Sequence, residues 1–354
     1  MTMGLVYDEE YLKHEHTPTH PERRERLQYT MDQLEEEGVL ASDAVVPIEP
    51  LEATDDQIAR VHTREYIERL RSMSASGTGM LSVDTHVSEH TWATARLAAG
   101  GVIAGLEAVV DGQTDTAFVM ARPGGHHAFR GDGHGFCYLN NTAVGIRHVQ
   151  ETTDVERVLV WDWDAHHGDG TQSIFFDDPS VMVMSTHQDG RTLFPGTGDV
   201  EDVGTGEGEG YNVNVPVPPK TTDSGYERVV EAVFEPIATQ YDPDVLFIEA
   251  GQDNHFTDPI TDLGVTAQGY AHLMDVAVTA ADRLTDGQIV ASLAGGYGIE
   301  GGLPYTNLAV IASLLGYDTA AIREPSIYTP PSYEPDVNDV IERVRRVHGE
   351  YWDL

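Results

Sequence analysis

The stretch VLVWDWDAHHGDG, residues 158–170, carries three aspartates and two histidines at the end of an apolar run. Asp164 and His166 are two residues apart, so at the end of a strand their side chains project to the same side. Asp253 follows another apolar run, in the sequence GQD. Two carboxylates and one imidazole suit Zn²⁺ or Fe²⁺, with one coordination position left open for water. We therefore predict a catalytic metal site; the alternative is that these side chains only cap loops.

A second pair of adjacent histidines, His126 and His127, lies in PGGHHAF, where glycines let the backbone approach a ligand. Adjacent side chains after a strand cannot both enter the core, so one imidazole is available to exchange a proton with metal-bound water. Each imidazole would need a carboxylate to orient it, and Asp162 and Asp169 are available for this. The sequence therefore predicts two His–Asp pairs, with surface histidines as the alternative.

Three aromatic residues follow glycine-rich turns or adjoin them. Tyr297 in LAGGYG can place a phenol against a substrate carbonyl and stabilise a developing oxyanion, although a core tyrosine would have the same local sequence. Phe136 in HGF and Phe194 in LFPGTGD are candidates for the walls of a narrow apolar slot. Ordinary packing is the alternative for both phenylalanines.

Five nearly continuous apolar runs rich in Val, Ile and Phe predict strands that are buried on both faces. These runs are TAFVMARP (116–123), VLVWDWD (158–164), VMVMSTH (181–187), DVLFIEAG (244–251) and QIVASLAGG (288–296). Segments of helical period lie at 22–37, 88–111, 140–151, 222–240 and 266–285, and plausible N-caps are Thr54, Ser88, Asp223 and Thr266. The alternation predicts an α/β protein with a parallel sheet and helices on both faces.

The residues with possible chemistry all follow the predicted strands. PGGHHAFRGDGHGF follows the first run, DWDAHHGDG the second, GQDNHFTDP the fourth and GGYG the fifth. In parallel α/β sheets ligands bind at the carboxyl ends of the strands. We therefore expect these four loops to form one site.

The chain of 354 residues contains no Ser/Pro/Gly-rich linker and no fixed-period repeat, so we predict a single domain, 1–354. The N-terminal stretch MTMGLVYDEEYLKHEH lacks a basic region and a long apolar region, so it is not typical of a secretory signal. No run of about 18 uncharged apolar residues predicts a membrane span. The single cysteine, Cys137, excludes an internal disulfide and favours a reducing compartment, so we expect a cytoplasmic protein.

The net charge is -38, from 59 acidic and 21 basic residues, and only Lys13 and Lys220 are lysines. A field this negative repels bare nucleic acid and anionic membranes, so we expect neither as a direct partner. An acidic surface can attract polycationic substrates. Because the charge is spread over the whole chain and lysine is nearly absent, we favour adaptation to a salt-rich, halophilic cytoplasm.

Together these motifs resemble a known family. PGGHHAFRGDGHGFCYLNN, DWDAHHGDG, FPGTGD, YNVNVPV, GQDNHFTDP and GGYG occur in the order found in the metal-dependent histone deacetylase and acetylpolyamine amidohydrolase family. HPERRERL at 20–27 resembles the N-terminal motif of that family, and the resemblance extends from about residue 5 to about residue 316. It implies an arginase–deacetylase fold, a three-layer α/β/α domain around a mainly parallel sheet of about eight strands.

The resemblance also implies a role for individual residues. The zinc ligands would be Asp164, His166 and Asp253, and the paired histidines His126 and His127 would bond Asp162 and Asp169 respectively. The tyrosine that polarises the substrate carbonyl would be Tyr297. The substrate tunnel would be lined by Phe136 and Phe194 beside Gly135, and Arg26 would line an internal channel for acetate release.

The family also binds structural potassium ions, which implies two K⁺ sites here. The first would use Asp162, Asp164, His166, Ser185 and Thr186. The second would use Phe175, Asp178, Val181 and Tyr211, partly through backbone carbonyls. A monovalent ion beside the zinc site would adjust local pKa values.

The sequence departs from the family pattern at Ala294, Arg24 and Asn141, where an acidic residue, proline and aspartate respectively are common. A rim aspartate that grips peptide backbone is represented only by Asp84, in a poorly matching context. We expect a Zn²⁺-dependent deacetylase, with Fe²⁺ as the alternative ion, that hydrolyses N-acetyl (acyl) amides of lysine side chains, in a protein or peptide, or of related alkylamines. The alternatives are an acetylpolyamine or small-amide amidohydrolase, a binuclear ureohydrolase and a non-catalytic acyl-amine binding module. For the ureohydrolase, His167 replaces the expected second-metal aspartate. The oligomeric state is open.

Overall fold

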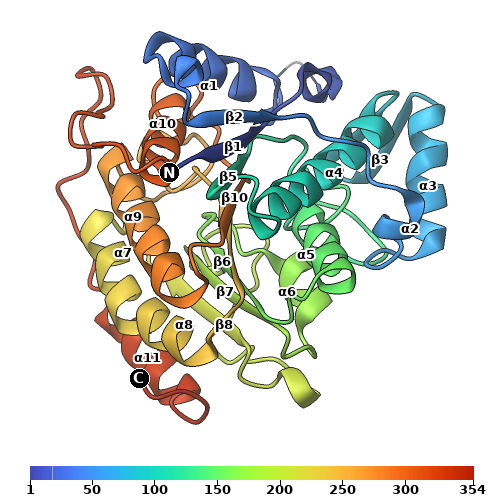
Figure 1. Cartoon of the computed structure of the whole chain (residues 1–354). Helices are drawn as coiled ribbons and strands as arrows, with labels where there is room; N and C mark the ends of the chain where they lie inside the picture. The colour runs from blue at the N-terminus through green and yellow to red at the C-terminus, as the bar shows by residue number, and fades with distance from the viewer. Residues whose placement is uncertain (18) are drawn as a thin grey trace.

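A sheet of eight parallel strands forms the centre of the protein (Figure 1). The computed structural model describes residues 1–17 and 19–354. The strand order is β2-β1-β5-β10-β9-β6-β7-β8. The strands are β1 (Met3–Val6), β2 (Val45–Ile48), β5 (Thr116–Val119), β6 (Val158–Asp162), β7 (Val181–Gln188), β8 (Asn212–Val217), β9 (Val245–Ala250) and β10 (Ile289–Leu293). A separate antiparallel pair, β3 (Thr78–Ser82) and β4 (Thr85–Ser88), lies outside this sheet.

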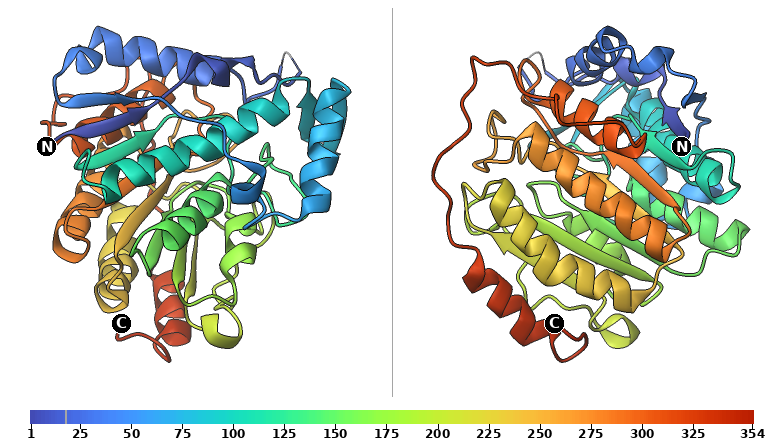
Figure 2. Two further views of the ribbon diagram at one scale, coloured as in Figure 1. Left: turned by 45° about the vertical axis from the view of Figure 1, so that its right-hand side comes forward. Right: turned by 60° about the vertical axis from the view of Figure 1, so that its left-hand side comes forward.

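Helices cover both faces of the sheet, which confirms the three-layer architecture (Figures 1 and 2). One face carries α4 (Thr91–Val110), α5 (Asn141–Thr152) and α6 (Asp169–Phe175), with α2 (Asp55–Ile58) and α3 (Arg64–Ala75) packed outside them. The other face carries α7 (Asp223–Val229), α8 (Glu235–Tyr241), α9 (Ala267–Leu284) and α10 (Leu303–Leu314). There α1 (Glu25–Glu36) packs on α10, and α11 (Asn338–His348) packs beside β8.

All five predicted strands are present in the sheet. Every residue of β5, β6, β7, β9 and β10 is buried, as expected for parallel strands covered by helices on both faces. The sequence did not predict β1, β2 and β8. The first two are only four residues long, and the asparagines of NVNVPV interrupt the apolar run in β8. Pro47 in β2 is accommodated because β2 is an edge strand.

The predicted helical segments are present with ends that differ by one to three residues, and two of the four proposed N-caps were wrong. Thr54 and Thr266 accept a backbone N–H at the start of α2 and α9. Ser88 instead ends β4, and α4 begins at Thr91 after a turn. Asp223 is the first residue of α7, and its carboxylate accepts hydrogen bonds from Thr266 at the start of α9. The segment predicted as one helix at 222–240 contains a π-helical turn, Val230–Phe234, between α7 and α8.

Helix α4 meets the length and apolarity of a membrane span, by composition alone. Of its most apolar 18-residue window, 72% is buried inside the protein, where α4 packs between the sheet and α5. Its apolar surface is therefore used in the core of this fold.

Candidate active site

Four neighbouring strands of the sheet, β5, β10, β9 and β6, end at the predicted site loops. Because these strands are parallel, their carboxyl ends lie along the same edge of the sheet. The register aligns Asp162, the last residue of β6, with Glu249 on one side and Ser185 on the other. The expectation that four polar loops meet at one edge is thus confirmed.

The structure brings together the three predicted metal ligands. His166 Nδ1 lies 2.8 Å from Asp253 Oδ2 and 3.1 Å from Asp164 Oδ1. One ligand atom from each of the three side chains lies within 4.8 Å of the others, and all three residues are buried. The second carboxylate oxygens accept backbone N–H groups, from Ala165 to Asp253 at 2.8 Å and from Gly295 to Asp164 at 2.6 Å. These hydrogen bonds fix both carboxylates in place.

The charge of this cluster fits a bound cation. Burial and the Asp164 charge raise the pKa of Asp253 to about 6, because two carboxylates are held close together away from water. The pKa of His166 rises to about 10: burial opposes this rise, but hydrogen bonds to Asp164 and Asp253 outweigh it. Two buried carboxylates with one imidazole form a donor set that suits Zn²⁺ or Fe²⁺, so the residues present fit a divalent metal ion.

Gly295 lies directly against these ligands. A Cβ atom at this position would lie 2.3 Å from Asp253 Oδ2 and 2.5 Å from Asp164 Oδ2. Only glycine therefore allows the loop after β10 to approach the two carboxylates this closely.

His126 and His127 form the two predicted pairs with carboxylates. His126 Nδ1 lies 3.0 Å from Asp162 Oδ2, and His127 Nδ1 lies 2.8 Å from Asp169 Oδ1. A carboxylate accepts hydrogen bonds, so each Nδ1 carries the proton and His127 Nε2 has a free lone pair. His126 Nε2 points toward Asp164, with its nearest carboxylate oxygen at 3.9 Å.

The two imidazoles have opposite electrostatic surroundings. Burial lowers the pKa of His126, but the charges of Asp164 and Asp162 outweigh it and raise that pKa well above the ordinary value. Burial and the neighbouring charge of His126 lower the pKa of His127 to about 3. The pair therefore combines an imidazolium, His126, with a neutral imidazole, His127.

Tyr297 is positioned by Arg26 and Asp258. Its backbone N–H donates to Asp258 Oδ2 at 2.7 Å, and Arg26 Nε donates to the Gly296 carbonyl at 2.7 Å. Arg26 also donates to the backbone carbonyl of Ala294, the position where the family commonly has an acidic residue. Ala294 therefore contributes a backbone contact to the same loop. Burial raises the pKa of the Tyr297 phenol well above its ordinary value, so the hydroxyl remains a hydrogen-bond donor at neutral pH.

Phe136 and Phe194 border different parts of the site. The Phe194 ring lies 5.2 Å from the His127 ring and 6.3 Å from the His166 ring. The Phe136 ring lies 5.8 Å from the Tyr297 ring. Gly135 has a φ of 54°, and a Cβ there would lie 2.4 Å from His127 Cδ2 and 3.0 Å from Phe194 Cε1. The absence of a side chain at Gly135 therefore keeps the approach to His127 open.

Sequence reasoning missed three polar residues at the site: Asp258, which bonds the Tyr297 N–H, and the residues His134 and Glu249. His134 Nε2 lies 3.0 Å from Asp169 Oδ2, so Asp169 bonds two histidines. Glu249 is buried beside Asp162 and accepts a hydrogen bond from the Thr142 hydroxyl. Burial and the Asp162 charge raise the pKa of Glu249 to about 8. The only sequence signal was position: His134 lies in a glycine-rich loop after β5, and Glu249 lies in an otherwise apolar strand.

The residues proposed for potassium lie in two groups. Asp162 and Ser185 are aligned partners at the ends of β6 and β7, with Thr186 next along β7. In the second group, the carbonyls of Phe175 and Asp178 accept turn hydrogen bonds, and the carbonyl of Tyr211 accepts from Val183. Asp178 also forms an ion pair with Arg147, a cation already beside the second set.

His167 stands where a binuclear site would need an aspartate for its second metal ion, and its ring nitrogens bond other side chains. Its Nδ1 lies 2.8 Å from Thr197 Oγ1 and its Nε2 lies 2.9 Å from Gln172 Oε1. Both ring nitrogens therefore already have hydrogen-bond partners.

Asp84, the candidate rim residue, lies in the turn between β3 and β4, where Thr85 Oγ1 donates to its carboxylate at 2.8 Å. The Phe136 N–H donates to the same hydroxyl at 3.1 Å, so Asp84 lies close to Phe136.

The other two departures from the family pattern have structural roles. Asn141 Nδ2 donates to the Pro123 carbonyl at 3.0 Å and so ties the start of α5 to the loop after β5. Arg24 forms an ion pair with Glu15 on the surface.

Comparisons with known proteins agree with this geometry. A family model described as "Histone deacetylase domain" matches residues 20–313. A protein of Archaeoglobus fulgidus named "Probable deacetylase" is 50% identical over 359 residues, covering 99% of each chain. A "Histone deacetylase-like amidohydrolase" of Pseudomonas aeruginosa is 34% identical, covering 86% of this chain and 78% of its own. The solved structure titled "Crystal Structure of HDA15 HD domain" matches with a TM-score of 0.88 and 32% identity, over 99% of this chain and 96% of that chain.

Proposed function

Because the chain belongs to the histone deacetylase family, we propose that it is a zinc-dependent deacetylase that hydrolyses N-acetyl amides of lysine side chains. The observation that carries this proposal is the buried cluster of Asp164, His166 and Asp253 beside the His127–Asp169 pair. Deacetylases and amidohydrolases hydrolyse acetylated amides. Metal-assisted hydrolysis of an amide requires a metal site and, beside it, a side chain that accepts a proton.

Asp164, His166 and Asp253 would hold the ion. A bound zinc ion acts as a Lewis acid on the carbonyl and lowers the pKa of its water to about 7. His127 accepts the proton of the attacking water at Nε2, because its Nδ1 is bonded to Asp169. The same Nε2 then donates this proton to the leaving amine, so the base is restored.

His126 and Tyr297 supply electrostatic assistance. Asp162 and Asp164 hold His126 as an imidazolium, which favours negative charge developing on the substrate carbonyl oxygen. The Tyr297 hydroxyl donates a hydrogen bond to the same oxygen. Phe136 and Phe194 flank the alkyl chain that carries the acetyl group. Arg26, which bonds the backbone of the Tyr297 loop, favours departure of the acetate anion through its positive charge.

The proposed deacetylase activity is tested with purified protein in high potassium salt, because we also propose K⁺ binding and adaptation to a salt-rich cytoplasm. Acetyl-lysine peptides, acetylated polyamines and small acetylated amides form the substrate panel. Asp253→Asn should abolish both hydrolysis and tight binding of the ion at the site, whereas Asp275→Asn, on the exposed face of α9, should change neither. A chelator should remove activity, and a hydroxamate should inhibit it.

The outcomes separate the alternatives. Faster turnover of acetylated polyamines than of peptides would replace the lysine substrate with a polyamine. Two ions that both leave in Asp253→Asn would favour a binuclear ureohydrolase. Clear binding of acetyl-lysine with undetectable hydrolysis, in protein that holds its ion, would contradict the proposal and favour a binding module.

A further inference from the structure

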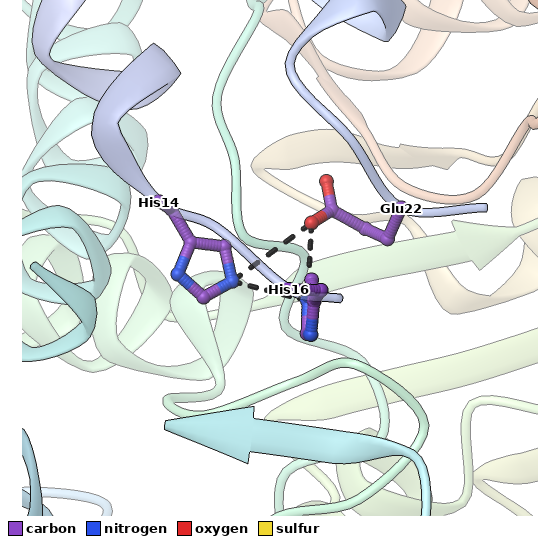
Figure 3. A group of neighbouring side chains, drawn as sticks. All are labelled: His14, His16 and Glu22. Atoms are coloured by element: carbon purple, nitrogen blue, oxygen red, sulfur yellow. Dashed lines mark hydrogen bonds and ion pairs between the residues drawn. The ribbon is translucent and has the colours of Figure 1, made fainter. Parts of the chain in front are cut away.

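Three side chains from the N-terminal segment converge outside the active site (Figure 3). His14 and His16 point their Nε2 atoms toward each other at 3.2 Å. Glu22 Oε2 lies 3.3 Å from His16 Nε2 and 3.8 Å from His14 Nε2. Figure 3 shows the imidazoles and the carboxylate facing a common point, and all three side chains are at most 2% exposed.

These separations match the spacing of ligands around a small divalent ion. With zinc–nitrogen and zinc–oxygen distances of about 2.0–2.1 Å, atoms at tetrahedral positions lie about 3.3 Å apart. Two of the three observed distances are within 0.1 Å of that value: 3.2 Å between the two Nε2 atoms, and 3.3 Å between His16 Nε2 and Glu22 Oε2. An ordinary N–H···N hydrogen bond between the imidazoles would account for the first distance but does not require the carboxylate.

A cavity adjoins the buried cluster. This cavity of about 290 Å³ is lined by His14, Glu15, His16, Thr17, Glu22, Arg23, Arg24 and Glu25. The cavity brings solvent to the edge of the cluster, so water can take the fourth coordination position beside a bound ion. Glu15 and Glu25 bring further negative charge to the same cavity.

Neighbouring contacts hold the ligand atoms in orientation. The His16 ring stacks on the His20 ring at 3.9 Å between centroids, and His14 Nδ1 lies 3.4 Å from Thr91 Oγ1. Among the residues that the structure describes, His16 Nδ1 has no hydrogen-bond partner although it is buried. The pair of Nε2 atoms is thus presented by rings that are packed in place.

Two arginines limit the strength of binding. Arg122 donates to both oxygens of Glu22 at 2.7 Å, and Arg26 donates to Oε1 at 3.2 Å. These positive charges repel a dication. The Asp164 site instead has two carboxylates, and no arginine among the described residues forms an ion pair with them. An ion at His14, His16 and Glu22 should therefore be held more weakly than the active-site ion.

We propose that His14, His16 and Glu22 form a second divalent-metal site, selective for zinc-like ions, that fixes the N-terminal segment beside the active site. From this position His20 contacts Phe136, with ring centroids 4.4 Å apart, and Glu22 bonds Arg26. The site adds a structural ion to the protein and does not depend on the reaction that the active site catalyses.

The primary test uses the wild-type protein and Zn²⁺ alone. Crystals equilibrated in micromolar and then millimolar ZnCl₂ should show an anomalous peak between His14 Nε2 and His16 Nε2, in addition to the peak at Asp164, His166 and Asp253. On stepwise titration with a chelator, the ion at His14 should leave first. No peak at His14 in millimolar Zn²⁺ would overturn the proposal and leave an ordinary hydrogen bond between the imidazoles.

Variants assign the second ion by stoichiometry. Wild type and the control His90→Gln/His272→Gln, which changes two exposed histidines, should hold about two ions per chain. His14→Gln/His16→Gln should hold about one and unfold at a lower temperature in Zn²⁺ but not in chelator. Two ions in this double variant would contradict the proposal. Because Asp253→Asn should remove only the active-site ion, the two variants measure the occupancy of the two sites separately.

Discussion

The Arg26 guanidinium lies over the Tyr297 ring, with its central carbon 4.9 Å from the ring centroid. Arg26 also bonds the Gly296 carbonyl, so one buried side chain holds both the ring and the backbone of the tyrosine loop. Cation–π contact of this kind keeps a phenol in one orientation without occupying its hydroxyl. The hydroxyl therefore remains available to the substrate.

Tyr297→Phe should leave the fold intact and lower kcat by about 10²–10³, since it removes one hydrogen-bond donor to the oxyanion. Turnover of an acetyl-lysine peptide measures this loss. Tyr333→Phe, at an exposed position, is the control and should retain full activity. Near-normal turnover by Tyr297→Phe would exclude the phenol from the reaction.

Removing the active-site ion should lower thermal stability as well as activity. Without the ion, Asp164 and Asp253 remain buried close together, and an ion that binds only the folded state at 100 times its Kd contributes about 2.7 kcal/mol. Melting temperature should therefore fall in chelator and recover with Zn²⁺. Mg²⁺ should not restore it, because Mg²⁺ prefers oxygen ligands with octahedral geometry. Equal recovery with Mg²⁺ would argue against an imidazole-containing site.

His134→Gln should destabilise the protein in a limited pH range. Burial opposes ionisation of His134, but Asp169 outweighs it and raises the pKa of His134 above 6.5. His127 and His134 lower the pKa of Asp169 below 3.8, despite burial. The histidine contribution is complete below about pH 6.5 and is lost as pH rises through its raised pKa, and the aspartate contribution is lost as pH falls below about 4.

Urea unfolding of wild type and His134→Gln should thus differ by about 1 kcal/mol near pH 5 and by little at pH 9. His90→Gln, which removes an exposed histidine beside Glu89, should show no such difference because surface pairs contribute little. A difference that is constant from pH 5 to pH 9 would mean that His134 acts through packing.

Glu249→Gln should stabilise the metal-depleted protein above about pH 5. With a pKa of about 8, set by burial and the Asp162 charge, folded Glu249 binds a proton that the unfolded chain releases near pH 4.5. Stability of the wild type therefore falls by up to about 1.4 kcal/mol per pH unit across this window, and glutamine removes that loss. Urea unfolding at pH 5, 7 and 8 should show a growing gain, and Glu231→Gln, at an exposed position, controls for the loss of one charge. A gain that does not grow with pH would contradict this reading.

Gly135→Ala should impair the enzyme more than its backbone conformation explains. Gly112 has a φ of 67° with no atom within 4 Å of an added Cβ, whereas Gly135 has a φ of 54° and faces His127. Gly112→Ala therefore measures the cost of the left-handed conformation alone, about 1 kcal/mol. Gly135→Ala should cost more in unfolding free energy and also reduce kcat, because His127 must move. Equal effects of the two substitutions would show that His127 yields freely.

The strands and loops that build the site were predictable because each depends on local sequence. Runs such as VLVWDWD are apolar on both faces, and the parallel arrangement brings their ends to one edge. The short edge strand β2 and helix α3, whose sequence REYIERLRSMSA is mostly polar, gave too little local signal. The proposed cap at Asp223 failed because its carboxylate bonds Thr266, a tertiary partner. The proposed cap at Ser88 failed because Ser88 ends strand β4, and its hydroxyl lies 3.1 Å from the hydroxyl of Thr91, the first residue of α4.

The same distinction applies to the site. Asp164 and His166 are neighbours in sequence, so their meeting could be predicted from strand geometry. His134 lies 35 positions from Asp169, and only the folded loop after β5 brings them together. Glu249 is one polar residue in an apolar strand, and its importance comes from the cross-strand register with Asp162.

Gly295 joins two parts of the enzyme that would otherwise vary independently. Its N–H bonds one ligand carboxylate, and two residues later the chain carries the phenol. We therefore expect a shift of the Asp164 carboxylate, on binding or loss of an ion, to move the backbone that carries Tyr297. An engineered change of the bound metal should consequently also change the position of the Tyr297 hydroxyl, so the metal site and the tyrosine loop need to be engineered together.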